Sequence, residues 1–159
     1  MTTPSILPTV ASGTYKDYLH TKVDRGGQAR VQAVQVSVPS GTTTTTIVGL
    51  APFNKGFRMN VGGTQLASAA LGSSVTLDIG YVYDLNGTYT NDSDAFATGL
   101  TAAAAGGLLV FDETTGLGAF CAEGDGWIVA VVQGATTGTT GNIFGQIEGV
   151  YDGLSAASN

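Results

Sequence analysis

Few side chains in this sequence are suited to catalysis. His20 is the only histidine and Cys121 is the only cysteine. A histidine acts in a catalytic triad only when it is held in place with a carboxylate behind it. Asp17 and Asp24 lie near His20, but the segment around them has no periodic pattern that predicts a rigid support. We therefore expect no triad at His20.

The cysteine lies in the apolar stretch Ala-Phe-Cys-Ala at residues 119–122. A nucleophilic cysteine needs an electropositive setting that lowers the pKa of its thiol, whereas an apolar setting is typical of a buried, inert thiol. One cysteine also excludes an intramolecular disulfide and a multi-cysteine metal site. These features fit a protein that assembles in a reducing compartment.

Two pairs of acidic residues have the composition that glycosidase chemistry requires, namely Asp112 with Glu113 and Glu123 with Asp125. Both pairs adjoin glycine-rich turns, which is typical of solvated loops. The acidic loop 84–94 offers oxygen ligands for calcium, but its glycine comes too early for an EF-hand. Glycine-rich phosphate-binding motifs are absent from the sequence. We expect a protein that is not an enzyme and that has no metal site and no cofactor.

Charge is divided along the chain. The six basic residues, which all precede residue 59, are Lys16, Lys22, Arg25, Arg30, Lys55 and Arg58. With two acidic residues among them, residues 1–58 carry 6 − 2 = +4, and the ten acidic residues that follow give −10. An acidic body repels nucleic acid and anionic membranes, whereas the basic segment suits an acidic protein surface. A plainer interpretation is that the basic residues have an ordinary density and only their later absence is unusual.

The composition favours strands over helices. Charged residues make up 11% of the chain, against roughly 25% in typical soluble domains. Glycine, threonine, valine and serine replace the strong helix formers. The mean hydropathy is positive, yet the longest apolar stretch, residues 100–111, is shorter than the roughly 20 residues of a membrane span. The N-terminus lacks the pattern of a signal peptide. The apolar excess predicts a surface that an oligomer or a partner covers.

Alternation of apolar and polar residues predicts most of the strands. We expect strands at 30–38, 42–50, 57–61, 75–83, 107–111, 127–132 and 142–151, with 127–132 buried on both faces. Residues 64–72 fit either a helical turn or a strand. A short helix is predicted from Asp92 or Ser93 through Phe96 and Leu100 to about residue 105.

The first predicted strand contains two phases of apolar residues. Val34, Val36 and Val38 share one face, whereas Val31 and Ala33 belong to the other. A β-bulge near Ala33 would place both sets in the core.

The predicted fold is all-β, an antiparallel β-sandwich that is jelly-roll-like and has an extended N-terminal arm. We expect the arm at residues 1–29, the sandwich body at 30–153 and a flexible tail at 154–159. Proline and glycine interrupt residues 1–29, and Tyr15, Tyr18 and Leu19 are scattered apolar anchors without a core pattern. Such a segment becomes ordered only on a neighbouring molecule.

The chain from Ile47 onward resembles the head decoration, or cement, proteins of tailed bacteriophages. The matching segments are residues 52–56 (Pro-Phe-Asn-Lys-Gly), 57–61, 71–74 (Leu-Gly-Ser-Ser), 75–80 (Val-Thr-Leu-Asp-Ile-Gly), the alanine-rich 100–107, and 134–138 (Gly-Ala-Thr-Thr-Gly) leading into 142–151. An insertion in residues 52–56 departs from the tighter Leu-Pro-Lys-Gly pattern of the family.

The resemblance implies a protein that binds the outer surface of a phage head, assembles in the host cytoplasm and stabilises the shell. The implied partners are the major capsid protein and two further copies in a homotrimer. The tentative contact residues with the capsid are Tyr15, Lys16, Tyr18, Lys22, Arg25, Arg30, Lys55 and Arg58. Two alternatives stay open at this point. One is another virion part, such as a tail tube, head fibre or baseplate subunit. The other is a carbohydrate-binding sandwich in which Tyr83, Tyr89 or Trp127 stacks on sugars.

Overall fold

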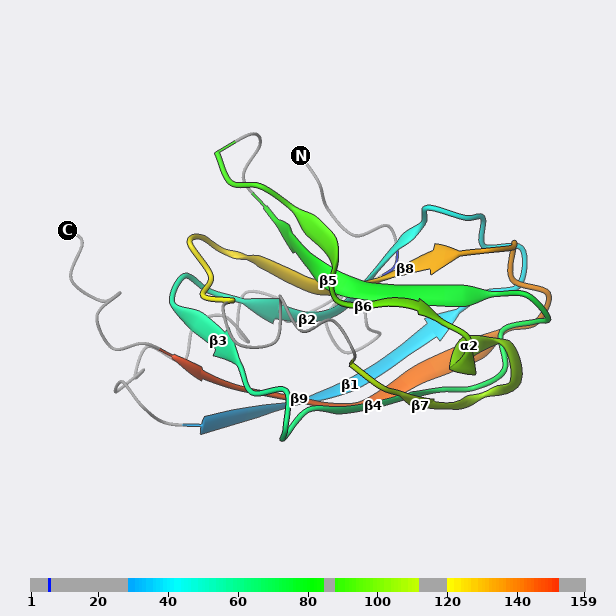
Figure 1. Cartoon of the computed structure of the whole chain (residues 1–159), viewed down its shortest axis with the longest axis horizontal. Helices are drawn as coiled ribbons and strands as arrows, with labels where there is room; N and C mark the ends of the chain where they lie inside the picture. Colours follow the sequence, from blue (N-terminus) through cyan, green and yellow to red (C-terminus); the bar gives the residue numbers. More distant parts are fainter. Residues whose placement is uncertain (1–5, 7–28, 85–87, 112–119, 152–159) are drawn as a thin grey trace.

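Strands from the two halves of the chain combine into two antiparallel sheets (Figure 1). The computed structural model describes residues 6, 29–84, 88–111 and 120–151. Within these ranges the elements are β1 (Ala29–Val38), β2 (Ile47–Phe53), β3 (Phe57–Met59), β4 (Gln65–Ser68), β5 (Thr76–Tyr83), β6 (Asp92–Leu100), α2 (Ala102–Ala105), β7 (Gly107–Leu109), β8 (Gly126–Gln133) and β9 (Gly141–Tyr151).

The strand pairing is nested. β1 pairs with β9, β2 with β8, β4 with β7 and β5 with β6, all antiparallel, so the chain is one long hairpin. Rolling this hairpin up brings β4 against β9 and β5 against β8. The strand order in the five-stranded sheet is β1-β9-β4-β7, and β3 also pairs with β9. The strand order in the four-stranded sheet is β2-β8-β5-β6. These orders describe a jelly roll, and the predicted all-β sandwich is confirmed. The predicted N-terminal arm falls almost entirely outside the described residues.

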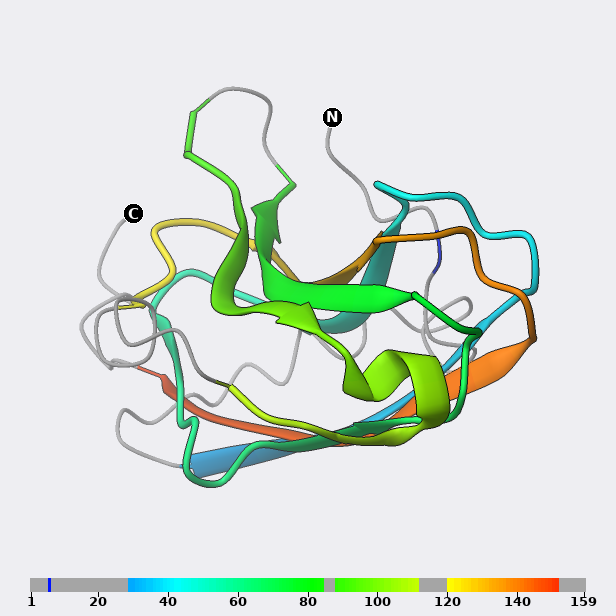
Figure 2. The ribbon, with the colours of Figure 1, turned by 45° about the vertical axis from the view of Figure 1, so that its right-hand side comes forward.

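The core lies between the two sheets. Val34, Val36 and Val38 of β1 are buried, and so are Ile143 and Ile147 of β9, as their spacing predicts. Across the sandwich the core is completed by β5 and β8, from which Leu77, Ile79, Ile128, Ala130 and Val132 belong to the same cluster. The short α2 carries the chain from β6 in one sheet to β7 in the other (Figure 2).

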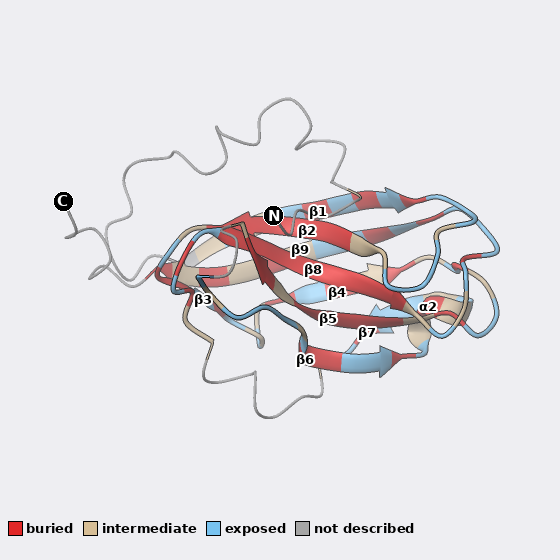
Figure 3. Cartoon of the chain, turned by 90° about the horizontal axis from the view of Figure 1, so that it is seen from above, coloured by how far each residue is buried: buried red, intermediate tan, exposed pale blue. Residues whose placement is uncertain are grey.

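Strand β8, inside the four-stranded sheet, is buried on both faces. β8 is buried from Gly126 to Val132, which confirms the prediction for residues 127–132. Trp127, Val129 and Val131 form a second apolar cluster with Val82 of β5, separate from the main core. In the five-stranded sheet, by contrast, exposed and buried residues alternate along β1 (Figure 3). The two sheets therefore differ in how much of their outer face is open to solvent.

Two predicted elements are only partly right. The strand predicted at 42–50 begins at Ile47 as β2, and residues 42–46 belong to the turn region before it. The helix predicted from about residue 92 to 105 is helical only at its end, as α2, and its part through Phe96 is strand β6, because Ala97 and Leu100 pair with Ile79 and Leu77 of β5. Tertiary pairing here overrides the local helix preference of the alanines. Residues 65–68 of the ambiguous segment 64–72 form the strand β4.

The predicted bulge in β1 is absent. Its ten residues pair with β9 in an unbroken register from Ala29 to Val38. Val31 and Ala33 therefore lie on the outer face of the five-stranded sheet, where both are exposed. The two apolar phases of this strand belong to two different surfaces.

We predict that Gly145→Ala destabilises the sandwich. Gly145 has φ +140°, and a Cβ there would collide with the carbonyl oxygen of Gln65 on the paired strand β4. The free energy of unfolding should fall by about 1–3 kcal/mol. Gly62→Ala is the matched control, because the nearest atom to its added Cβ is Asn60 Oδ1 at 3.6 Å. Urea unfolding measures both, and equal midpoints would contradict the close approach of β4 and β9.

Candidate interaction surface

The outer face of the five-stranded sheet is the most distinctive surface of the described chain. Register places Gln35, Phe144, Ala67 and Leu108 in one row across β1, β9, β4 and β7. Neighbouring rows carry the other outward residues of the same strands. We call this surface the open face. Its residues are Val31, Ala33, Gln35, Ser37, Arg58, Gln65, Ala67, Leu108, Val110, Asn142, Phe144, Gln146 and Glu148.

The exposed large apolar side chains gather on the open face. Leu108 is 70% exposed, Val110 63%, Val31 57% and Phe144 46%. These four are the large hydrophobic residues that are exposed within the described parts of the chain. Scattered exposed apolar residues are ordinary, but a set confined to one face indicates an interaction site.

The open face is almost free of charge. Arg58 and Glu148 are its only charged residues among those the structure describes, and their signs are opposite. Both lie toward the end of the sheet where β3 pairs with β9. Glu148 Oε1 accepts a hydrogen bond of 2.7 Å from Asn60 Nδ2. The remaining polar residues are amides and serine, which leaves the central rows neutral.

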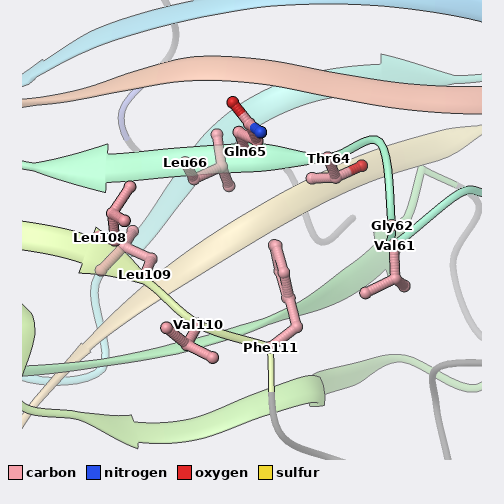
Figure 4. Close-up of a pocket in the computed structure, with 9 residues that line it drawn as sticks. All are labelled: Val61, Gly62, Thr64, Gln65, Leu66, Leu108, Leu109, Val110 and Phe111. Atoms are coloured by element: carbon pink, nitrogen blue, oxygen red, sulfur yellow. The ribbon is translucent and has the colours of Figure 1, made fainter.

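A groove of about 400 Å³ adjoins the open face beside β7 (Figure 4). Residues 61, 62, 64–66 and 108–111 line it. Val61, Leu66, Leu109 and Phe111 make it largely apolar, and Leu108 links the groove to the central row of the open face. The apolar surface thus continues from the sheet into a depression at its edge.

Three of the predicted contact residues are described. Arg30 of β1 lies opposite Gly149 and Arg58 of β3 lies opposite Val150, so two basic residues flank the end of β9. The guanidinium carbon of Arg30 is 5.9 Å from the centre of the Tyr151 ring, within the range of a cation–π contact. Lys55 is exposed in the turn between β2 and β3.

The structure therefore brings these three basic residues to one end of the sandwich. The other five tentative contacts, Tyr15, Lys16, Tyr18, Lys22 and Arg25, lie outside the described residues.

Aromatic rings fill the sandwich at the same end. Phe53 stacks on Phe57 with ring centres 6.0 Å apart, and Tyr83 meets Phe53 edge-on at 5.7 Å. Tyr83 is 3% exposed and Trp127 is 2% exposed, so neither presents a ring face on which a sugar can stack. The ring of Tyr89 packs 5.1 Å from that of Tyr83. This geometry offers no support for the carbohydrate-binding alternative.

Burial raises the pKa of the Tyr81 phenol above its ordinary value, and the charges of Tyr83, Asp92 and Glu123 raise it further. Its ring lies 4.3 Å, centre to centre, from that of Phe120 and 5.4 Å from that of Tyr83. Burial also raises the pKa of Tyr83. Removing a proton from either phenol would place a charge within this aromatic cluster.

Among the candidate catalytic groups, Cys121, Glu123 and Asp125 lie within the described residues. Cys121 is half-buried rather than buried as predicted, since it lies in the loop that leads into β8. The backbone N–H of Glu123 donates to the Tyr83 hydroxyl at 3.2 Å, and Asp125 Oδ1 accepts from the backbone N–H of Lys55 at 2.9 Å. His20, Asp112 and Glu113 lie outside the described residues.

The described residues contain no group of three histidine, cysteine or acidic side chains that could hold a metal ion. No helix among them has the length and apolar character to cross a membrane.

Sequence reasoning missed the open face. The sequence feature that pointed to this face was the second apolar set in the first predicted strand, Val31 and Ala33. A bulge was expected to move these two residues into the core. Leu108 and Val110 gave a weaker signal, because they lie in a short apolar run with no clear alternation. The register of β1 and β7 decides that Val31, Ala33 and Leu108 point outward. Val110 follows β7 and is exposed beside the groove.

No model of a protein family matches the sequence, and no curated protein matches it significantly. Among solved structures, a chain of the capsid of Ralstonia phage GP4 has a TM-score of 0.61 and 16% identity, covering 82% of this chain and 88% of that one. A chain of the capsid asymmetric unit of cyanophage Pam1 has a TM-score of 0.60 and 19% identity, covering 80% and 87%. At these identities the likeness establishes a shared fold.

We predict that Tyr81 ionises above its ordinary pKa of about 10 in the folded protein. Because the unfolded state loses this proton first, the contribution of Tyr81 to stability is complete below about pH 10 and is lost as the pH rises further. The difference in absorbance at 295 nm between wild type and Tyr81→Phe isolates this group during a pH titration. The same difference in denaturant is the control and should show a midpoint near 10. A native midpoint at or below the denatured one would contradict the prediction.

Proposed function

We propose that this chain is a structural protein of a phage virion that decorates the outer surface of the head and stabilises the shell. The observation that carries the proposal is the jelly-roll sandwich, shared over most of its length with chains from two phage capsids. The sequence resemblance to decoration proteins from Ile47 onward is a separate line of support. The decoration role is finer than the shared fold and rests on that resemblance.

The proposed mechanism needs no reacting groups. A protein that binds the assembled shell but not its dissociated subunits shifts the equilibrium toward the shell by mass action. At a free concentration of a hundred times Kd, each site would gain about 2.7 kcal/mol. Many identical sites on one particle make this gain large. In this proposal the chain has no catalytic activity and works through contact surfaces alone.

We further propose that the major capsid protein is the partner, and that the basic residues contact it. Arg30 and Lys55 lie at one end of the sandwich, and Lys16, Lys22 and Arg25 belong to the segment that precedes β1. Strand β6 carries the exposed Asp92 and Asp94 and no basic residue, so it would face solvent on an acidic shell. We also propose that the chain acts as a homotrimer at the capsid surface.

We predict that the purified protein raises the melting temperature of undecorated phage heads. No binding and no shift would rule out decoration, and imaging of virions would then show whether the chain belongs to the tail, a head fibre or the baseplate.

Charge reversal tests the proposed contact residues. The triple variant Lys16→Glu, Lys22→Glu, Arg25→Glu and the single variant Lys55→Glu should each bind heads at least about tenfold more weakly, equal to about 1.4 kcal/mol. Asp94→Lys is the matched control, because it reverses an exposed charge on β6 of the acidic body. Binding to heads measured at several salt concentrations compares the variants. Equal affinities in all of them would show that the basic residues do not face the shell.

A further inference from the structure

The open face has a chemical character that identifies its partner. Its central row, Gln35, Phe144, Ala67 and Leu108, combines apolar side chains with an amide and contains no charge. The core of a protein interface is depleted of charged residues in the same way. Solvent-facing sheets in monomeric proteins usually carry charged residues instead. The open face therefore has the composition of a surface that is covered during function.

Charge limits which partner can cover it. The chain has a net charge of −6, so two copies repel each other wherever their acidic residues meet. Within the open face Arg58 and Glu148 cancel, and the central rows are neutral. Identical copies can approach through this face without bringing like charges together. A foreign acidic partner would be matched by a basic surface, and the open face is not basic.

The polar residues of the open face are able to pair with copies of themselves. Gln35, Gln65 and Asn142 are exposed, and Gln146 is half-buried. A side-chain amide both donates and accepts hydrogen bonds, whereas a carboxylate only accepts and a lysine only donates. A row of amides is thus complementary to the same row on another copy. Charged side chains at these positions would lack that property.

The size of the open face suits a small protein contact. Four strands at about 4.8 Å spacing are about 14 Å wide, and the ten paired residues of β1 and β9 at about 3.3 Å rise are about 33 Å long, whereas β4 has four residues and β7 has three. The flat area of the face is therefore at most roughly 460 Å², against about 800 Å² per partner in a standard interface. A contact between copies would use the whole open face together with the groove beside β7. Small side chains at Ala33, Ser37 and Ala67 keep the face flat enough for close packing.

We propose that the open face is the surface through which copies of this chain contact one another. A face that meets the same face of another copy makes a two-fold contact, so the proposal goes beyond the three-fold homotrimer of the proposed function. It does not depend on how the protein binds a shell. The copies associate by burying Val31, Leu108, Val110 and Phe144, and the amides of the face pair across the contact.

Light scattering of the purified protein, without phage heads, tests the proposal. The wild type should be an oligomer at about 100 µM and dissociate on dilution. The variant Gln35→Glu, Gln65→Glu, Asn142→Asp keeps the shapes of three side chains and adds three like charges to the open face. At low salt this variant should be monomeric, because the dissociation constant of its oligomer should be at least about a hundredfold higher than that of the wild type. Phe144→Asp, which replaces an apolar side chain of the central row, should have the same effect.

Two controls separate loss of contact from loss of folding. Gln133→Glu makes the same change at a half-buried site at the end of β8, in the other sheet, and should remain oligomeric. About 1 M salt shortens the Debye length to about 3 Å, so it should restore association of the triple variant. A misfolded protein would not recover in salt, and circular dichroism checks the fold directly.

A wild type that is monomeric at about 100 µM would overturn the inference, and so would a triple variant that associates like the wild type. Thr44→Asp changes the uncharged loop before β2. If this variant dissociates the oligomer while the open-face variants have no effect, the contact lies elsewhere and the inference is overturned. None of these results bears on head binding, because the melting assay reports that separately. The two proposals can therefore fail independently.

Discussion

The whole sandwich depends on the pairing of β9, the last strand described, with the first strands of the chain. β9 pairs with β1, β3 and β4, so the five-stranded sheet exists only once β9 has been placed. The contacts involved are long in sequence: the Ser40 N–H donates to Thr140 Oγ1 across 100 residues. Closing such loops costs entropy before any contact is gained, which makes folds of this type slow to form. Glycines at 145 and 149 allow β4 and the Phe57 ring to approach β9 closely.

The nested pairing also makes the two sheets unequal. β8 lies inside the four-stranded sheet with apolar residues on both sides, and both sides are buried. In the five-stranded sheet β9 likewise lies inside the sheet, but only one of its sides faces the core. If that outer side only faced solvent, charged side chains would be expected on it. Here it carries amides, alanine and a few large apolar residues, and this difference is the structural basis for assigning it a partner.

Sequence patterns predicted the strands whose alternation is strict. The spacing of Val75, Leu77 and Ile79 placed the strand that became β5, and Ile143, Ile147 and Tyr151 placed the buried side of β9. The patterns failed where local preference and tertiary pairing disagree, as in β6, where alanines suggested a helix. They also failed at Val31 and Ala33, for a different reason. Sequence reasoning assumed that every apolar residue of a strand belongs to the core of one molecule, and no local pattern distinguishes a core residue from an interface residue.

The same limit applies to the candidate sites. Basic residues were easy to notice because their absence after residue 58 is visible in the sequence, whereas a neutral face is visible only when strands are placed side by side. The two surfaces differ in the chemistry that they offer. In the proposed function the basic residues would attract an acidic partner over distance and respond to salt. In the proposed contact between copies the neutral face would act only at contact, through burial and amide pairing. A protein that does both needs the two contacts to be distinct, since a surface attractive to both partners would form the wrong complex. Apart from Arg58, the basic residues that the structure describes lie off the neutral face, and this separation of charge from apolar area would provide that distinction.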